Sequence, residues 1–258
     1  MRIYSLSDKY ADSLRASGRR PLTIRLHLHY VNRLDRLGDL EDITPEMLER
    51  WLARPGWSAE TRKSARGVAR SFFRWCFRKG FIDADPARDL APVKVPPGSP
   101  RPVPQGMLDD ALAKADERTR LMILFAAKAG LRASEIAGLN RNDFDGVMLH
   151  VKGKGGRVRS IPIVDTRLKS ALTQADPWVF PSWEGHLTAG VVTKAVSDVL
   201  PKGWTCHKLR HRFASQAYAG THDILSVQKL LGHSSPATTQ RYVATPPDAL
   251  LKAVAAAA

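Results

Sequence analysis

The sequence predicts a mainly α-helical protein with an N-terminal helical domain at residues 1–90 and a C-terminal α+β domain at residues 107–258, which contains one small β-hairpin. The first observation is a proline-rich segment, APVKVPPGSPRPVPQG at residues 91–106, whose prolines disfavour helix and sheet and favour an extended linker. The second is the helical spacing of apolar residues along most of the chain. The third is a glycine-rich turn between two short apolar stretches at residues 146–164, which is typical of a hairpin.

The first domain has the capping residues that helix ends require. We expect helices at residues 6–17, 21–34, 44–53 and 58–80. Thr44 is suited to be an N-cap, and Pro45 follows it at the first helical position, where its missing N–H costs nothing. Ser58 begins the last of these helices, and Gly80 is placed to end it.

The second domain combines helices with the hairpin. A buried helix is expected to begin near residue 118 and to break at Gly130, and a second short helix follows the break. After the hairpin, we expect helices near residues 165–174 and 188–200, and then three helical stretches up to the end of the chain.

The charge balance indicates a polyanionic partner. Lys and Arg number 40 against 25 Asp and Glu, so the net charge is +15, and such an excess favours nucleic acid over an anionic membrane. No apolar run is long enough to span a membrane, and the first 30 residues do not resemble a signal peptide. Two cysteines, Cys76 and Cys206, do not form a disulfide or zinc framework, so we expect reduced thiols, a cytoplasmic protein and no membrane partner.

Arginines recur every four residues along the expected helix at 58–80, where they form one slowly drifting stripe. The arginine stripe consists of Arg62, Arg66, Arg70, Arg74 and Arg78. A solvated helix face is the simpler interpretation, but such faces usually mix charges of both signs, and residues 61–80 contain no acid. The stripe therefore favours contact with DNA phosphates. The apolar residues of the same helix are expected in the core: Val68, Phe72, Trp75 and Cys76.

Four motifs contain side chains suited to phosphoryl transfer. They are AGLRASEIAGL with Arg132, VKGKGGRVR with Lys154, HKLRHRFAS with His207 and Arg210, and LGHSSPATTQRYV with His233 and Tyr242. Two guanidiniums can hold the non-bridging oxygens of one phosphate, and histidines can donate to the same oxygens or move protons. A lysine can protonate a departing oxygen, and a tyrosine can attack the phosphorus. No acidic cluster accompanies these residues, so we expect chemistry without a metal.

Each of these residues also has a structural interpretation when it is taken alone. Arg132 after a glycine fits a capping residue, Lys154 fits an ordinary hairpin turn, and Tyr242 fits simple packing. His207 fits a first helical turn, and His233 fits the residue that follows a helix end. Their joint occurrence in this order favours an active site.

The second domain resembles the tyrosine recombinases, the family that includes phage integrases and Xer-type resolvases. The resemblance covers roughly residues 105–245 and includes all four motifs in family order and spacing. The first domain resembles, more weakly, the helical domain with which these proteins bind core sites. Two residues depart from the family pattern without removing a catalytic group: Arg212, where many relatives have a small hydroxyl residue, and Arg241, where many have an apolar one.

The resemblance implies which residues bind the scissile phosphate. Arg132 and Arg210 would hold its oxygens. His207 would bond the phosphate and assist proton transfer, and His233 would bond and position it. Glu135, one helical turn from Arg132, would hold that guanidinium in place.

The resemblance also implies a nucleophile and a general acid. Tyr242 would attack the phosphorus and carry a 3′-phosphotyrosyl link. Lys154 would protonate the 5′-oxygen that leaves. Lys152 is the rival for this role, but Lys154 lies between Gly153 and Gly155 at the tip of the turn, where family sequences carry their lysine.

The implied function is site-specific DNA recombination by a phage or prophage integrase that needs no cofactor, metal or ATP. Its partners would be double-stranded DNA with core-type attachment sites, further copies of the chain in a tetramer on DNA, and accessory proteins that bend DNA or set directionality. The helical domain starts within the first few residues, so we expect no separate arm-binding domain. The alternatives are a Xer-like resolvase or mobile-element recombinase, a type IB topoisomerase, and a non-enzymatic DNA-binding regulator.

Overall fold

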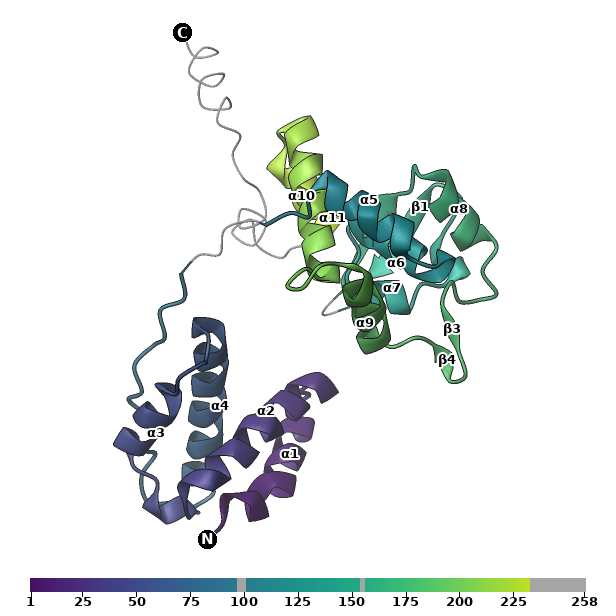
Figure 1. The fold of residues 1–258 in the computed structure, drawn as a ribbon. Helices are drawn as coiled ribbons and strands as arrows, with labels where there is room; N and C mark the ends of the chain where they lie inside the picture. Colours follow the sequence, from purple (N-terminus) through teal and green to yellow (C-terminus); the bar gives the residue numbers. More distant parts are fainter. Residues whose placement is uncertain (97–100, 154–155, 233–258) are drawn as a thin grey trace. The chain divides into compact units, whose positions relative to one another are not determined.

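The computed structural model of the protein describes residues 1–96, 101–153 and 156–232 (Figure 1). The chain divides into two compact units, Met1–Pro97 and Gly98–Ala258. Helices dominate both units, as the sequence predicts. In the described part of the chain, no helix has the length and apolar character needed to cross a membrane.

The regular elements of the first unit, in its described residues, are all helices, apart from one isolated β-bridge between Arg2 and Asp39. Its elements are η1 (Ile3–Leu6), α1 (Ser7–Ala16), α2 (Pro21–Leu34), η2 (Asp35–Leu37), η3 (Leu40–Asp42), α3 (Pro45–Leu52) and α4 (Ala59–Arg78), where η denotes a 3₁₀ helix. The predicted α-helices are confirmed. The short 3₁₀ turns were not predicted, because three or four residues carry too little periodicity to be recognised.

The predicted caps of the first unit are also confirmed. The Thr44 hydroxyl accepts a hydrogen bond from the Met47 N–H at 3.3 Å, and the Ser58 hydroxyl accepts one from the Thr61 N–H at 3.1 Å. Each cap satisfies a backbone donor that the first turn of a helix leaves without a partner. Gly80 follows the end of α4 with a φ of +70°, a conformation that favours glycine.

The longest helix, α4, supplies much of the first unit's core. Phe72 and Cys76 are completely buried, and Val68 and Trp75 nearly so, which confirms the predicted core face. Tyr10 of α1 packs edge-on against Phe72, with ring centroids 5.2 Å apart. These contacts fix the orientation of α4 and hence the direction in which its arginines point.

The second unit combines helices with two small antiparallel sheets. Its elements are α5 (Gln105–Lys114), α6 (Glu117–Lys128), α7 (Ala133–Ala137), η4 (Arg141–Asp143), β1 (Met148–Lys152), β2 (Val158–Pro162), α8 (Thr166–Thr173), β3 (Pro181–Ser182), β4 (Gly185–His186), α9 (Ala189–Val199), α10 (Cys206–Thr221) and α11 (Ile224–Leu231). The predicted hairpin is the β1–β2 pair, in which Leu149 lies opposite Ile161 and Val151 opposite Arg159. Helix α5 and the two-residue pair β3–β4 were not predicted.

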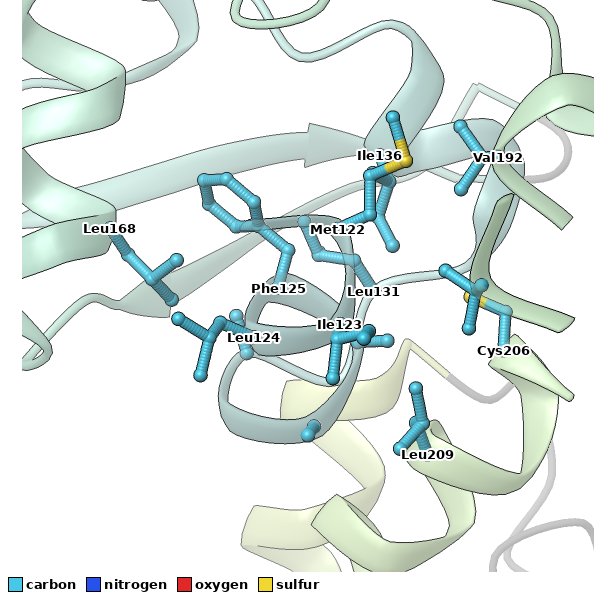
Figure 2. Packing of buried hydrophobic residues seen from close by; sticks show 14 of the residues in the cluster. Met122, Ile123, Leu124, Phe125, Leu131, Ile136, Leu168, Val192, Cys206 and Leu209 are labelled. Atoms are coloured by element: carbon cyan, nitrogen blue, oxygen red, sulfur yellow. The ribbon is translucent and has the colours of Figure 1, made fainter. Parts of the chain in front are cut away.

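Helix α6 lies at the centre of the second unit. Its residues Met122, Ile123 and Phe125 are at most 1% exposed. Figure 2 shows them among side chains of the surrounding helices, including Leu168 of α8 and Leu209 of α10. A helix buried on most of its surface is expected from its nearly continuous apolar sequence.

Gly130 ends this central segment, as predicted. Its φ is +64°, and the Leu131 N–H donates to the Phe125 carbonyl at 3.2 Å, a hydrogen bond that closes the end of the helix. A Cβ atom at Gly130 would lie 2.4 Å from the Phe213 ring, so a larger residue does not fit. The break turns the chain so that Arg132 starts the next helix, α7.

The end of the proline-rich segment packs on the second unit. Val103 is completely buried, and its carbonyl accepts a hydrogen bond from Arg212 Nη1 of α10 at 2.7 Å. Arg212 Nη2 donates to the side-chain oxygen of Gln105, the first residue of α5. The linker expected to extend to residue 106 is therefore too long at this end, because burial and these bonds join Val103 and its successors to the second unit.

We predict that Arg212→Ala lowers the free energy of unfolding by about 2 kcal/mol, because a buried carbonyl loses a charged donor. Denaturation in urea measures the change. The matched control is Arg167→Ala on α8, an exposed arginine whose loss should change stability by no more than about 0.5 kcal/mol. Equal effects of both variants would contradict a stabilising role for Arg212.

Candidate active site

Arg132 and Arg210 meet at Glu135, although they are far apart in the sequence. Arg132 is the N-cap of α7, and its Nη1 donates to Glu135 Oε1 at 2.7 Å. Arg210 projects from α10, is 1% exposed, and has its Nη1 3.7 Å from Glu135 Oε2. Arg210 also donates to the carbonyls of Gly130 and Leu231, which ties it to the helix break and to the end of α11. The fold thus brings together the two arginines that the sequence motifs singled out.

The Glu135 carboxylate is buried and ionised. Its side chain is 5% exposed, and burial alone would raise its pKa. The hydrogen bonds and charge of Arg159, the Arg132 N–H at 2.8 Å and the charge of Arg210 outweigh burial and lower the pKa to about 2. The site therefore holds a fixed anion in the middle of several fixed cations.

Arg159 is a part of the site that the sequence did not single out. Its Nη1 and Nη2 donate to the two oxygens of Glu135 at 2.8 and 2.7 Å, a bidentate pair. The signal that identifies it is strand alternation: Arg159 has the same parity as Ile161 and Ile163, which are both buried. A charged residue at an inward position of a strand needs a buried partner, and here that partner is Glu135.

His207 lies in the first turn of α10, three residues before Arg210. Its side chain remains accessible to solvent, yet the surrounding protein partly desolvates the ring. This desolvation and the positive charges of Arg210, Lys208 and Arg132 lower the pKa of the imidazole. A neutral imidazole beside guanidiniums can accept a proton as well as donate a hydrogen bond.

The remaining expected site residues, Lys154, His233 and Tyr242, lie outside the described residues. The described chain reaches the neighbours of two of them. Helix α11 ends at Leu231, and Gly232 follows it with a φ of +64°. The alternative lysine, Lys152, is exposed at the end of β1.

The arginine stripe of α4 is not uniform. Arg74 and Arg78 are exposed, whereas Arg62, Arg66 and Arg70 are half-buried. Arg66 uses its Nε and Nη2 to donate to the Leu90 carbonyl, with the Nε bond at 3.0 Å. Burial and the charge of Arg70 lower the pKa of Arg66. The carboxyl-terminal half of the stripe is therefore the part that is open to a ligand.

The described segments contain no metal-binding cluster, and their two thiols are buried. Within residues 1–96, 101–153 and 156–232, no group of three or more His, Cys, Asp or Glu residues is arranged to hold a metal. Cys76 and Cys206 are buried free thiols, and burial raises the pKa of each to about 12. Metal-independent chemistry remains a prediction of the sequence.

Comparison with known proteins identifies the family. The model of the phage integrase family matches residues 105–247, which contain all four motifs and more than half of the chain. The chain belongs to the phage integrase family. This family member is 33% identical over 239 residues to the tyrosine recombinase XerC of Rhodospirillum centenum, an alignment that covers 80% of this chain and 69% of that protein. It is 29% identical over 271 residues to the tyrosine recombinase XerA of Thermococcus onnurineus, covering 97% and 94%.

Solved structures of integrases and recombinases share the fold of this family member. A lambda integrase dimer bound to a COC′ core site matches with a TM-score of 0.75 at 20% identity, over 92% of this chain and 76% of that one. The XerH site-specific recombinase bound to difH matches with a TM-score of 0.69 at 20% identity, over 97% and 84%. The mainly helical fold with small antiparallel sheets is thus that of the family.

Because the pKa of Glu135 is lowered in the folded protein, the free energy of unfolding of this integrase-family member depends on pH in the acid range. The ionised carboxylate contributes about 3 kcal/mol above its ordinary pKa of 4.5, and this contribution is lost as the pH falls toward the folded pKa of about 2. We predict that Glu135→Gln removes this part of the decline between pH 4.5 and 2. Denaturant titrations across that range measure it, with the exposed Glu184→Gln as the control. Parallel pH profiles for wild type and Glu135→Gln would contradict the assignment.

Because only some arginines of the stripe are exposed, we predict that substitutions along it differ in their effect on the salt dependence of DNA binding. If the exposed part of the stripe contacts DNA as the sequence predicts, Arg74→Ala and Arg78→Ala should each reduce the slope of log K against log salt by about 0.9 on any B-form duplex, the change expected for one lost phosphate contact. Arg66→Ala is the matched control, since its guanidinium is already bonded to Leu90. Binding isotherms at several salt concentrations give the slopes. Unchanged slopes for both exposed positions would exclude the stripe from the DNA interface.

Proposed function

We propose that the protein is a site-specific DNA recombinase that cuts and rejoins duplex DNA through a 3′-phosphotyrosyl intermediate formed by Tyr242. The proposal rests on family membership and on one observation: Arg132 and Arg210 converge on a single buried carboxylate, Glu135. Such convergence prearranges cationic donors, which is what a transferring phosphoryl group requires. In a surface cluster, the arginine side chains must lose conformational freedom when the phosphate binds. Here Glu135 already holds the guanidiniums in place.

The described residues suit the role of a phosphate clamp. Arg132 is 35% exposed, and of its guanidinium nitrogens only Nη1 donates to Glu135, so within the described part of the site its other guanidinium donors are available to a phosphate oxygen. Arg210 is buried near the same carboxylate and adds fixed positive charge. The proposal assigns both guanidiniums to the non-bridging oxygens, where they stabilise the charge that develops when phosphorus becomes five-coordinate.

The proposed cleavage step is a transesterification. The Tyr242 oxygen forms a bond to phosphorus, and the bond from phosphorus to the 5′-oxygen breaks. His207, whose lowered pKa favours the neutral imidazole, accepts the phenol proton, while Lys154 supplies a proton to the departing 5′-oxygen. His233 bonds the phosphate. The energy of the phosphodiester is retained in the tyrosyl ester, so rejoining needs no ATP.

The first unit is proposed to bind the core site, through the exposed half of the arginine stripe. Assembly into a tetramer on DNA is part of the proposal, and a solved lambda integrase tetramer bound to a Holliday junction is among the similar structures, with a TM-score of 0.73 at 20% identity. Accessory proteins that bend DNA or set directionality are additional candidate partners. Because the substrate is DNA, the proposal puts the protein in the cytoplasm of a bacterial or phage-infected cell.

Three biological roles are compatible with this chemistry: integration of phage DNA, Xer-like resolution, and recombination of a mobile element. The similarity to XerC and XerA proteins, at 33% and 29% identity, favours the Xer-like role. Resolution acts on two copies of a site within one DNA molecule, whereas integration joins two molecules. Plasmids that carry the recovered site in either arrangement distinguish resolution from integration.

The chemistry is tested by covalent capture. We predict that the protein, incubated with a library of nicked duplexes of random sequence, forms adducts that survive denaturation and whose DNA can be sequenced. Tyr242→Phe should bind the same duplexes and form no adduct, because it lacks the attacking oxygen.

Three outcomes contradict the proposal in different ways. DNA binding by wild type without any adduct would favour a regulator. An adduct formed by Tyr242→Phe would mean that another residue is the nucleophile. Cleavage and relaxation of DNA without exchange between two recovered sites would favour a topoisomerase.

A further inference from the structure

Arg159 occupies a central position in the site although it does not face the solvent. It projects from β2, and its side chain is 8% exposed. Its guanidinium donates hydrogen bonds to two different segments: two go to Glu135, and a third runs from Nε to the Leu230 carbonyl of α11 at 2.8 Å. A single planar guanidinium thus joins the hairpin, the start of α7 and the end of α11.

Arg159 holds Glu135 more firmly than either proposed phosphate-binding arginine does. Arg132 makes one side-chain bond to Glu135, and Arg210 approaches only to 3.7 Å. Arg159 binds both carboxylate oxygens, which fixes the plane of the carboxylate. Since Glu135 Oε1 accepts from both Arg159 and Arg132, the position of that oxygen determines where the Arg132 guanidinium lies.

The end of α11 is also built on Arg159. The carbonyl of Leu230 accepts a hydrogen bond from Arg159, and the carbonyl of Leu231 accepts one from Arg210. A Cβ atom at Gly232 would lie 2.8 Å from Arg159 Cδ, so the backbone here packs directly on the arginine side chain. Gly232 is the last described residue before His233 in the sequence.

We infer that Arg159 is a positioning residue of the cleavage reaction, which acts through Glu135 to fix Arg132 and Arg210 and does not itself touch DNA. This inference rests on the proposed function. Lysine cannot replace this arginine, because one ammonium group lacks the rigid fork that binds both carboxylate oxygens and the Leu230 carbonyl at once. A displacement of about 1 Å in a reacting group costs about 100-fold in rate.

The test is a double-mutant cycle on a nicked duplex recovered by covalent capture, with adduct formation followed in a single turnover at saturating protein. Arg159→Lys should slow the reaction by about 10- to 100-fold and leave non-covalent binding of the duplex unchanged. Glu135→Gln should slow it too. Because both act along one chain of contacts, the double variant should be no slower than Glu135→Gln alone.

Arg141→Lys is the matched control, an exposed arginine in the same unit that should react like wild type. Thermal melting reports whether each variant folds, and Arg159→Gln replaces Arg159→Lys in the cycle if the latter does not melt cooperatively. A wild-type rate in the folded Arg159 variant would overturn the inference. Multiplied effects in the double variant would also overturn it, since they would indicate that Arg159 acts independently of Glu135. Failure of wild type to form an adduct would instead overturn the proposed function, and the inference with it.

Discussion

The second unit depends on one buried carboxylate and the guanidiniums around it. Moving an isolated carboxylate from water into a protein interior costs several kcal/mol of solvation free energy. Only close opposite charges and hydrogen bonds offset that cost. Glu135 has both, from Arg159 and Arg132 directly and from Arg210 at longer range. The same contacts explain why its pKa falls to about 2 despite burial.

This group of charges is unbalanced, and the imbalance suits the proposed chemistry. Three guanidiniums around one carboxylate leave two positive charges at a site where the protein excludes much of the water. A phosphodiester brings one negative charge, and a five-coordinate phosphorus with an attacking oxygen anion carries two. The charge is therefore better matched to the transition state than to the substrate, which is the condition for accelerating the reaction and not only for binding DNA.

The elements of the fold serve to bring these charges together. Gly130 breaks the central helix and leaves Arg132 at the start of α7, and its carbonyl accepts from Arg210. Arg159 lies on the inward face of the hairpin, where it bonds Glu135. The buried Arg212 of α10 bonds Val103 and Gln105 at the start of the second unit, so the helix that carries Arg210 and His207 is held through more than one of its side chains.

Local patterns in the sequence determined much of this protein. Helix periodicity, the caps at Thr44 and Ser58, the break at Gly130 and the hairpin follow from interactions between neighbouring residues, which is why they were predictable. The motifs also indicated the family, and they singled out Arg132, His207 and Arg210 as candidate site residues. Helix α5 was missed because it begins within a proline-rich segment that indicated a linker.

Only the tertiary structure decided which charges share one site. Whether a stripe arginine is open or bonded depends on a carbonyl 24 residues away, as for Arg66 and Leu90. The role of Arg159 depends on a carboxylate 24 residues earlier in the chain and on the end of a helix 71 residues later. Sequence periodicity reports which face of an element is buried, but the partner on that face is set by packing between segments that local interactions do not connect.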